Sequence, residues 1–169
     1  ANSEQEATDL SEELTLSLLY ALLPLHFPNE YEKVWSRIIY LLKLKKRCSV
    51  RFVSTLVSAV TEGRASFAAT KFVMRDDLTR EHVTDPTVLR VALCSGALDA
   101  KTVEAFAANR PKEFRDKCRS ILLEAEQVAQ SPGSFRQFCP VEVSAGGSTW
   151  SEQQFAENVT RLMQELRLG

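Results

Sequence analysis

The chain is poor in the residues that break helices. Six glycines and six prolines make up 12 of its 169 residues, or about 7%, whereas the two together make up about 12% of an average protein. This scarcity argues against a turn-rich β-sandwich and favours long helices. No run of about 20 apolar residues occurs, so we expect no membrane span. The apolar fraction of 44% and charged fraction of 25% are ordinary for a folded globular protein.

The chain also lacks an excess of charge and a cysteine motif. Its 21 basic and 22 acidic residues give a net charge of −1, whereas nucleic-acid binders usually carry a clear basic excess. A nucleic-acid partner is therefore not expected. The four cysteines form no CxxC pair, so no zinc site is expected. Such sparse cysteines are more typical of buried thiols in a reducing compartment than of a disulfide framework.

Enzyme signatures are missing as well. The sequence has no GxxxxGK[ST], GxSxG, HExxH or GxGxxG motif. Its two histidines, His26 and His82, stand far apart in the chain, and a catalytic or metal role needs partners at a defined geometry. The adjacent carboxylates of Asp76 and Asp77 point in different directions and predict a solvated turn. We expect no catalytic residue, no metal and no cofactor.

The apolar pattern predicts a single all-α domain over residues 1–169. Apolar residues recur at i, i+3, i+4 and i+7, as on one face of a helix. We expect a flexible N-terminus (1–8), three helix pairs (9–110), a long helix (111–130), a loop (131–149) and a C-terminal helix (150–168). The expected helix starts are the capping residues Asp9, Asn29, Ser49, Asp85, Asp99 and Ser151.

Several positions recur with a period of about 33 residues. Leu22, Leu56 and Leu89 are separated by 34 and 33 positions, and Gly63 and Gly96 by 33. Two helices per unit of 33 to 35 residues are typical of an α-solenoid, in which stacked hairpins bury faces that one hairpin cannot cover. The pattern predicts a right-handed α-solenoid of about three degenerate hairpins with extra C-terminal helices.

The middle unit, residues 54–74, resembles the pentatricopeptide repeat. The matching positions are Thr55-Leu56-Val57, the Gly63-Arg64 turn, Ala68, Phe72 and Met74, and the turn is one residue shorter than is usual in that family. Residues 88–106 form a weaker copy, and residues 14–23 with 31–42 a degenerate first copy. The resemblance covers roughly residues 10–110.

Within that family the chain is similar to the small accessory subunits of euglenozoan mitochondrial F1-ATPase. This resemblance rests on size, the absence of an initiator methionine, the repeat type and overall sequence character. It implies a processed mitochondrial protein on the matrix side, peripheral to the inner membrane. Such a protein would be a non-catalytic structural subunit, bound to the outside of the F1-ATPase through an α subunit.

The alternative is an RNA-binding pentatricopeptide protein of organellar RNA processing or of a ribosome. Members of this family usually read one base per repeat. The resemblance places the main reading residue, normally Asn, Ser or Thr, early in the first helix of each unit. Ser54 or Thr55 would fit this pattern, whereas Val88, Leu89 and Arg90 in the next unit depart from it.

Two regions supply candidate partner-binding residues. The first is a basic cluster after the second expected helix, which could be a solubilising helix end, grip phosphates or face an acidic partner protein. The second is the final helix with the residue before it, which could either cap the open end of the solenoid or dock on a partner. The candidates are Lys43, Lys45, Lys46 and Arg47 in the first region, and Trp150 and Phe155 in the second.

Overall fold

The computed structural model describes residues 28–44, 48–63, 65–131, 133–139 and 151–168. Within these ranges every regular element is a helix, which confirms the all-α class. The helix expected to start at Asp9 lies outside the described residues. The helices are α2 (Pro28–Leu44), α3 (Val50–Thr61), α4 (Phe67–Arg75), α5 (Asp77–Arg80), α6 (Thr87–Ser95), α7 (Ala100–Ala107), α8 (Lys112–Gln130), α9 (Phe135–Phe138) and α10 (Glu152–Leu168).

Three of the predicted caps start helices in the structure. The Ser49 hydroxyl accepts a hydrogen bond from the Phe52 amide at 3.1 Å, and the Asp99 carboxylate accepts one from the Thr102 amide at 2.7 Å. The hydroxyl of Ser151 likewise accepts from the third amide of α10. Each cap satisfies a donor that the first helical turn leaves without an intrahelical partner.

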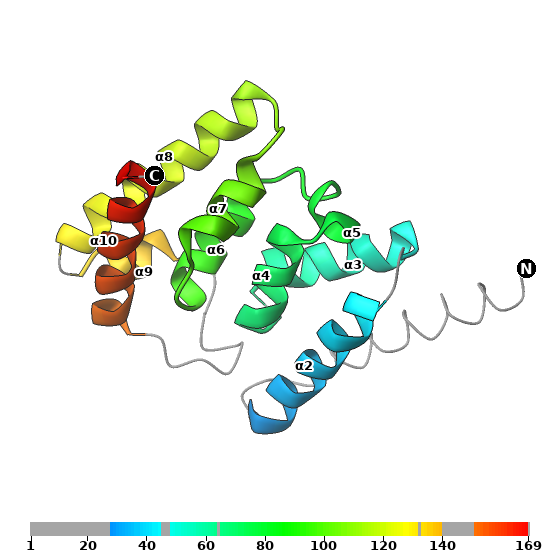
Figure 1. The fold of residues 1–169 in the computed structure, drawn as a ribbon. Coiled ribbons are helices and arrows are strands. Elements are labelled where there is room, and N and C mark those ends of the chain that lie inside the picture. Colours follow the sequence, from blue (N-terminus) through cyan, green and yellow to red (C-terminus); the bar gives the residue numbers. More distant parts are fainter. Residues whose placement is uncertain (1–27, 45–47, 64, 132, 140–150, 169) are drawn as a thin grey trace, which may run out of the picture.

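Helices α3 and α4 form one central pair, and α6 and α7 form the next. Equivalent helices of the two pairs pack on each other. The first helix of one pair, α3, contacts the first helix of the next, α6, and α4 contacts α7 in the same way. On one side α2 packs against α4, and Figure 1 shows α2, α4 and α7 following one another across the molecule. At the other side α8 and α10 pack along each other and cover α6 and α7.

The buried positions repeat between the two central pairs. Leu56 of α3 and Leu89 of α6 are both buried, as are Phe72 of α4 and Phe106 of α7. The sequence period equates Leu56 with Leu89, and Phe72 and Phe106 are 34 positions apart. The apolar seam that they form is continuous with a core running from Trp35 to the C-terminal helices.

Gly63 and Gly96 are 33 positions apart, at equivalent places in the two central pairs, but they have different structural roles. Gly63 has a φ of 72°, in the left-handed region that favours glycine after a helix. Gly96 has extended backbone with a φ of 173°. A Cβ at position 96 would stand 2.7 Å from Cδ2 of the Phe67 ring, so here glycine permits the close approach of α4.

The Asp76-Asp77 pair begins a short helix, where the sequence had predicted only a solvated turn. Asp76 caps α5 by accepting a hydrogen bond from the Leu78 amide at 2.9 Å. The Asp77 side chain is 86% exposed and forms an ion pair with Arg80 at 3.1 Å. The prediction of solvation thus fits Asp77, but it missed the helix because four residues are too few to show a period.

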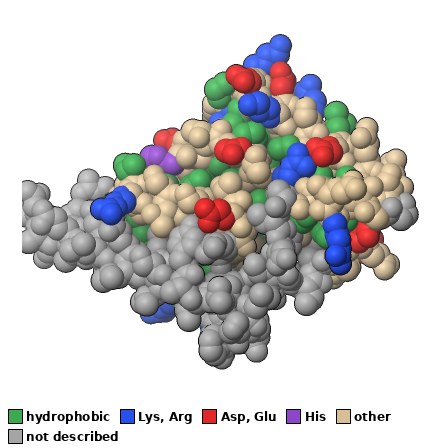
Figure 2. Space-filling model, turned by 180° about the vertical axis from the view of Figure 1, so that it is seen from behind, with side chains coloured by type: hydrophobic (Ala, Val, Ile, Leu, Met, Phe, Trp, Pro, Cys, Tyr) green, Lys and Arg blue, Asp and Glu red, His purple; other side chains and the backbone are tan. Residues whose placement is uncertain are grey.

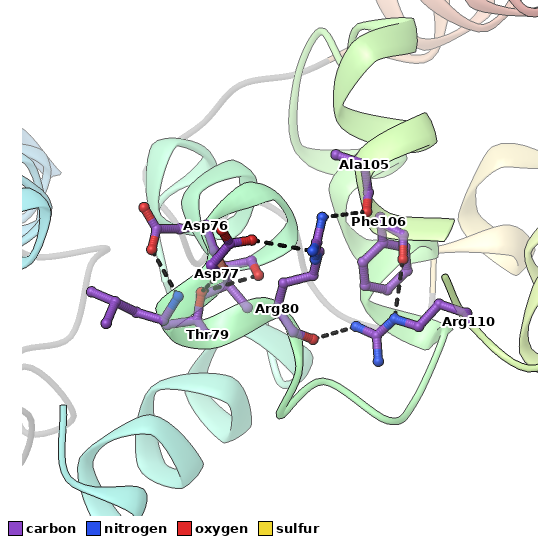
Figure 3. Close-up of polar contacts among 9 residues, drawn as sticks. Asp76, Asp77, Thr79, Arg80, Ala105, Phe106 and Arg110 are labelled. Atoms are coloured by element: carbon purple, nitrogen blue, oxygen red, sulfur yellow. Dashed lines mark hydrogen bonds and ion pairs between the residues drawn. The ribbon is translucent and has the colours of Figure 1, made fainter. Parts of the chain in front are cut away.

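Two arginines join α5 to the helices that follow (Figure 3). Nη1 of Arg80 donates to the Ala105 carbonyl of α7 at 3.1 Å. Arg110, between α7 and α8, donates in turn to the Arg80 carbonyl and, at 3.3 Å, to the Phe106 carbonyl. These bonds fix the end of α5 relative to α7 and to the segment before α8.

Candidate functional site

A groove of about 570 Å³ lies between α2 and α4. Its lining combines an apolar floor with charged side chains at the rim. The residues are Ile39 and Lys43 of α2, Ala68, Lys71, Phe72 and Arg75 of α4, and Asp76 after α4. Because α2 and α4 pack directly on each other, this groove follows the seam between them.

Helix periodicity brings the cations of the groove together. Lys71 and Arg75 are four residues apart on α4 and therefore lie on one face of that helix. Lys43 lies in the last turn of α2, where a cation also complements the helix dipole. The floor residues Ile39 and Phe72 are each only 7% exposed, so they belong to the core and orient both helices.

Two of the three cations of the groove have no ion-pair partner among the described residues. Lys43 and Arg75 make no ion pair with another described residue, and both side chains are exposed. The ammonium of Lys71 lies 3.3 Å from the Asp99 carboxylate. The remaining carboxylate, that of Asp76, is held by its capping bond to α5. The groove therefore presents Lys43 and Arg75 to an anionic ligand.

The hydrogen bonds that Asp99 accepts change its pKa. Partial burial would raise the pKa of Asp99, but hydrogen bonds from Thr102 and Lys71 outweigh it and lower the pKa to about 2. Asp99 is thus ionised at neutral pH and links α7 to the rim of the groove.

The structure places one of the predicted basic residues in this groove. Lys43 is exposed at the rim, as expected of a partner-binding cation. Lys45, Lys46, Arg47 and Trp150 lie outside the described residues.

The prediction that Phe155 binds a partner is wrong. Phe155 is 0% exposed, and its ring centroid lies 4.9 Å from that of Phe135 and 5.6 Å from that of Phe138. The apolar stripe of α10 faces α8 and the core. Of the two interpretations of the final helix, the structure fits the one in which it covers the core.

Lys71 and Arg75 are groove residues that the sequence interpretation missed. Their i, i+4 spacing was a usable signal, since it puts two cations on the exposed side of a helix whose other side is apolar. Their juxtaposition with Lys43 depends on the packing of α2 on α4, which no local pattern reveals.

The described side chains visible on the reverse face of the molecule carry charges of both signs. Figure 2 shows Lys, Arg, Asp and Glu side chains scattered between hydrophobic ones there. Among the described residues no group of three or more His, Cys, Asp or Glu is placed to hold a metal ion. None of the described helices is both long enough and apolar enough to cross a membrane.

Comparison with known proteins leaves the groove as the main guide to function. No family model matches the chain, and neither a curated protein nor a solved structure matches it.

Proposed function

We propose that the chain is a non-catalytic adaptor that binds an acidic segment of another protein in the groove between α2 and α4. The observation that carries this proposal is the set of three cations, Lys43, Lys71 and Arg75, around an apolar floor. A binding groove of this kind supplies charge complementarity at the rim and apolar contact at the centre.

The proposed scaffold is a right-handed α-solenoid of pentatricopeptide-like hairpins. The packing of α3 on α6 and of α4 on α7 supports it, since each pair then contacts its neighbour through equivalent helices. The proposed partner is the α subunit of mitochondrial F1-ATPase, on the matrix side of the inner membrane. The support for this partner is the resemblance in size, repeat type and overall sequence character.

A protein partner is favoured over RNA by the positions at the start of α6 that correspond to Ser54 and Thr55, although Ser54 itself is exposed. Val88 and Leu89 are fully buried, so they cannot meet a base. Arg90 is engaged by Glu124 at 2.9 Å. The groove lining offers one aromatic ring for stacking, Phe72, which is 7% exposed. Sequence-tolerant RNA binding relies on exposed aromatic platforms.

The proposal is tested by reversing the charge of the groove. Tagged wild-type protein is expressed in its native cells and purified at low salt, and the co-purifying proteins are identified by mass spectrometry. We expect stoichiometric F1-ATPase subunits with the wild type, and a loss of about tenfold or more with Lys43→Glu plus Arg75→Glu. The matched control, Lys101→Glu plus Arg119→Glu, changes the net charge equally at exposed positions of α7 and α8.

Three results would contradict the proposal. Equal loss of F1-ATPase in both double variants would show a general charge effect. Recovery of other proteins in place of F1-ATPase, lost only in the groove variant, would keep the groove and reject the proposed partner. Recovery of ribosomal or RNA-processing proteins, with tight binding of single-stranded RNA at about 150 mM salt, would support the RNA alternative.

A further inference from the structure

Two cysteines far apart in sequence meet where the segment after α9 reaches α6. Cys94 lies in the last turn of α6 and is 0% exposed, whereas Cys139 directly follows α9 and is partly exposed. The two thiols lie close enough together for each to shift the pKa of the other. Both cysteines are free, so this contact joins two reduced sulfurs.

Arg90 holds this arrangement in place. It lies one turn before Cys94 on α6, and its Nη1 donates to the Phe138 carbonyl at 3.3 Å. Its guanidinium carbon lies 4.6 Å from the centroid of the Phe138 ring, which is itself buried. Nη1 and Nη2 of Arg90 also donate to the carboxylate of Glu124 in α8. The peptide that precedes Cys139 is therefore fixed against α6 by an orienting cation.

The surroundings make the two thiols chemically unequal. The hydrogen bond from Cys94 lowers the pKa of Cys139 and outweighs burial, and the nearby charge of Arg90 lowers it further. For Cys94, that hydrogen bond and burial both raise the pKa far above its usual range. A partly exposed thiolate beside a cation is a nucleophile. Once its sulfur is in a mixed disulfide, Cys139 no longer carries the charge that raises the pKa of Cys94, so Cys94, near Arg90, can ionise and attack that disulfide.

We propose that Cys94 and Cys139 form a redox-active pair that closes to an intramolecular disulfide when a low-molecular-weight disulfide, such as oxidised glutathione, reacts with Cys139. In the first step the Cys139 thiolate attacks one sulfur of oxidised glutathione, which forms a mixed disulfide and releases one glutathione thiolate. In the second step the sulfur of Cys94 attacks the Cys139 sulfur and releases the second glutathione, which takes up the Cys94 proton. Two protein thiols are oxidised and one glutathione disulfide is reduced to two thiols.

The other cysteines provide internal references. Cys118 is 4% exposed on α8, and burial raises its pKa to about 11 although Arg110 acts in the opposite direction. It should therefore react slowly. Cys48 lies before α3. Replacing Cys48 and Cys118 by serine leaves a chain in which any internal disulfide must join Cys94 to Cys139.

The test uses that Cys48→Ser plus Cys118→Ser chain. The protein is equilibrated in glutathione buffers of increasing oxidised fraction, quenched in acid, alkylated, and measured by intact mass and non-reducing peptide mapping. We expect both thiols to become protected from alkylation together, with one internal disulfide and no lasting glutathione adduct. Peptide mapping of the wild type, which needs no substitution, should find the same linked pair of peptides.

Single variants test the order of the steps. With Cys94→Ser the glutathione adduct should persist on Cys139, because no resolving thiol remains. With Cys139→Ser the buried Cys94 should stay unmodified. Arg90→Gln should slow alkylation of Cys139 severalfold, whereas Glu124→Gln, which removes the same ion pair from its other side, should not.

The proposal fails if Cys94 and Cys139 stay reduced in a glutathione buffer that oxidises an accessible dithiol. It also fails if the glutathione adduct forms first on Cys94, or if the only disulfides formed link two chains. The experiment reads only this thiol pair, so its outcome is independent of whether the groove binds a partner.

Discussion

Replacing Gly96 by alanine probes the contact between the two central helix pairs. The new Cβ would stand 2.7, 2.8 and 3.0 Å from three ring atoms of Phe67, the first residue of α4. The extended backbone of Gly96, with a φ of 173°, is one that alanine adopts without strain. The whole penalty therefore comes from the ring, and it can be removed by removing the ring.

The expected change in the free energy of unfolding on Gly96→Ala is the balance of two opposing effects. Forcing a methyl group into a packed contact costs about 1–3 kcal/mol. Replacing glycine by alanine restricts the unfolded chain and stabilises the fold by about 0.4–1 kcal/mol. We expect Gly96→Ala to lower the free energy of unfolding by roughly 0.5–2 kcal/mol in the wild type. In the Phe67→Ala background the same change should raise it by about 0.4–1 kcal/mol.

Urea unfolding of the four proteins of this cycle, followed by circular dichroism, measures the two effects. The midpoint should move while the urea dependence stays constant, because the surface exposed on unfolding is the same. Gly133→Ala is the matched control. Gly133 has a φ of 89° and no neighbour within 4 Å of an added Cβ, so its cost is backbone strain and should be equal in both backgrounds. An equal cost of Gly96→Ala in both backgrounds would refute the ring contact.

Two further predictions concern the C-terminal helix and the rim of the groove. Phe155→Ala should destabilise the protein by about 3–5 kcal/mol in urea unfolding, since the ring is 0% exposed. The control Leu123→Ala removes a side chain that is 46% exposed and should change the stability by about 0.5 kcal/mol or less. If the two substitutions cost the same, α10 does not pack in the core. The pKa of Asp99, about 2, is depressed in the folded state, so its contribution is complete above the unfolded value of 3.8 and is lost as pH falls toward 2. Asp99→Asn, which keeps a capping oxygen, should therefore lose less stability than the wild type between about pH 5 and pH 2. Parallel pH curves would contradict the lowered pKa that the hydrogen bonds from Thr102 and Lys71 give to Asp99.

The fold class and most helix starts could be predicted because they depend on neighbours in sequence. A cap such as Ser49 acts on an amide three residues away, and an apolar stripe such as that of α3 is visible within one helix. The short helices α5 and α9 were missed for the same reason, since four residues cannot display a period of 3.6. The sequence period correctly equated Leu56 with Leu89, both of which are buried.

The function of an individual residue was harder to predict, because it depends on what tertiary packing brings near it. Phe155 follows the same i, i+4 pattern whether it meets a partner or the rings of α9, and only the position of α9 decides. Gly63 and Gly96 fall at equivalent positions of the sequence period. Gly63 adopts a left-handed conformation, whereas Gly96 makes room for the Phe67 ring. Spacing identified the positions, but it could not supply the physical reason for each.

The thiol pair depends on packing in the same way. Arg90 and Cys94 lie one turn apart on α6, which sequence alone makes evident. Their partner Cys139 lies in a stretch that the sequence assigned to a loop, and it reaches α6 because the neighbouring Phe138 is buried under the Arg90 guanidinium. The apolar ring fixes the segment, and the thiol chemistry follows from where that segment ends. Two reactive groups 45 positions apart in the chain are thus brought together by an aromatic side chain that takes no part in the reaction.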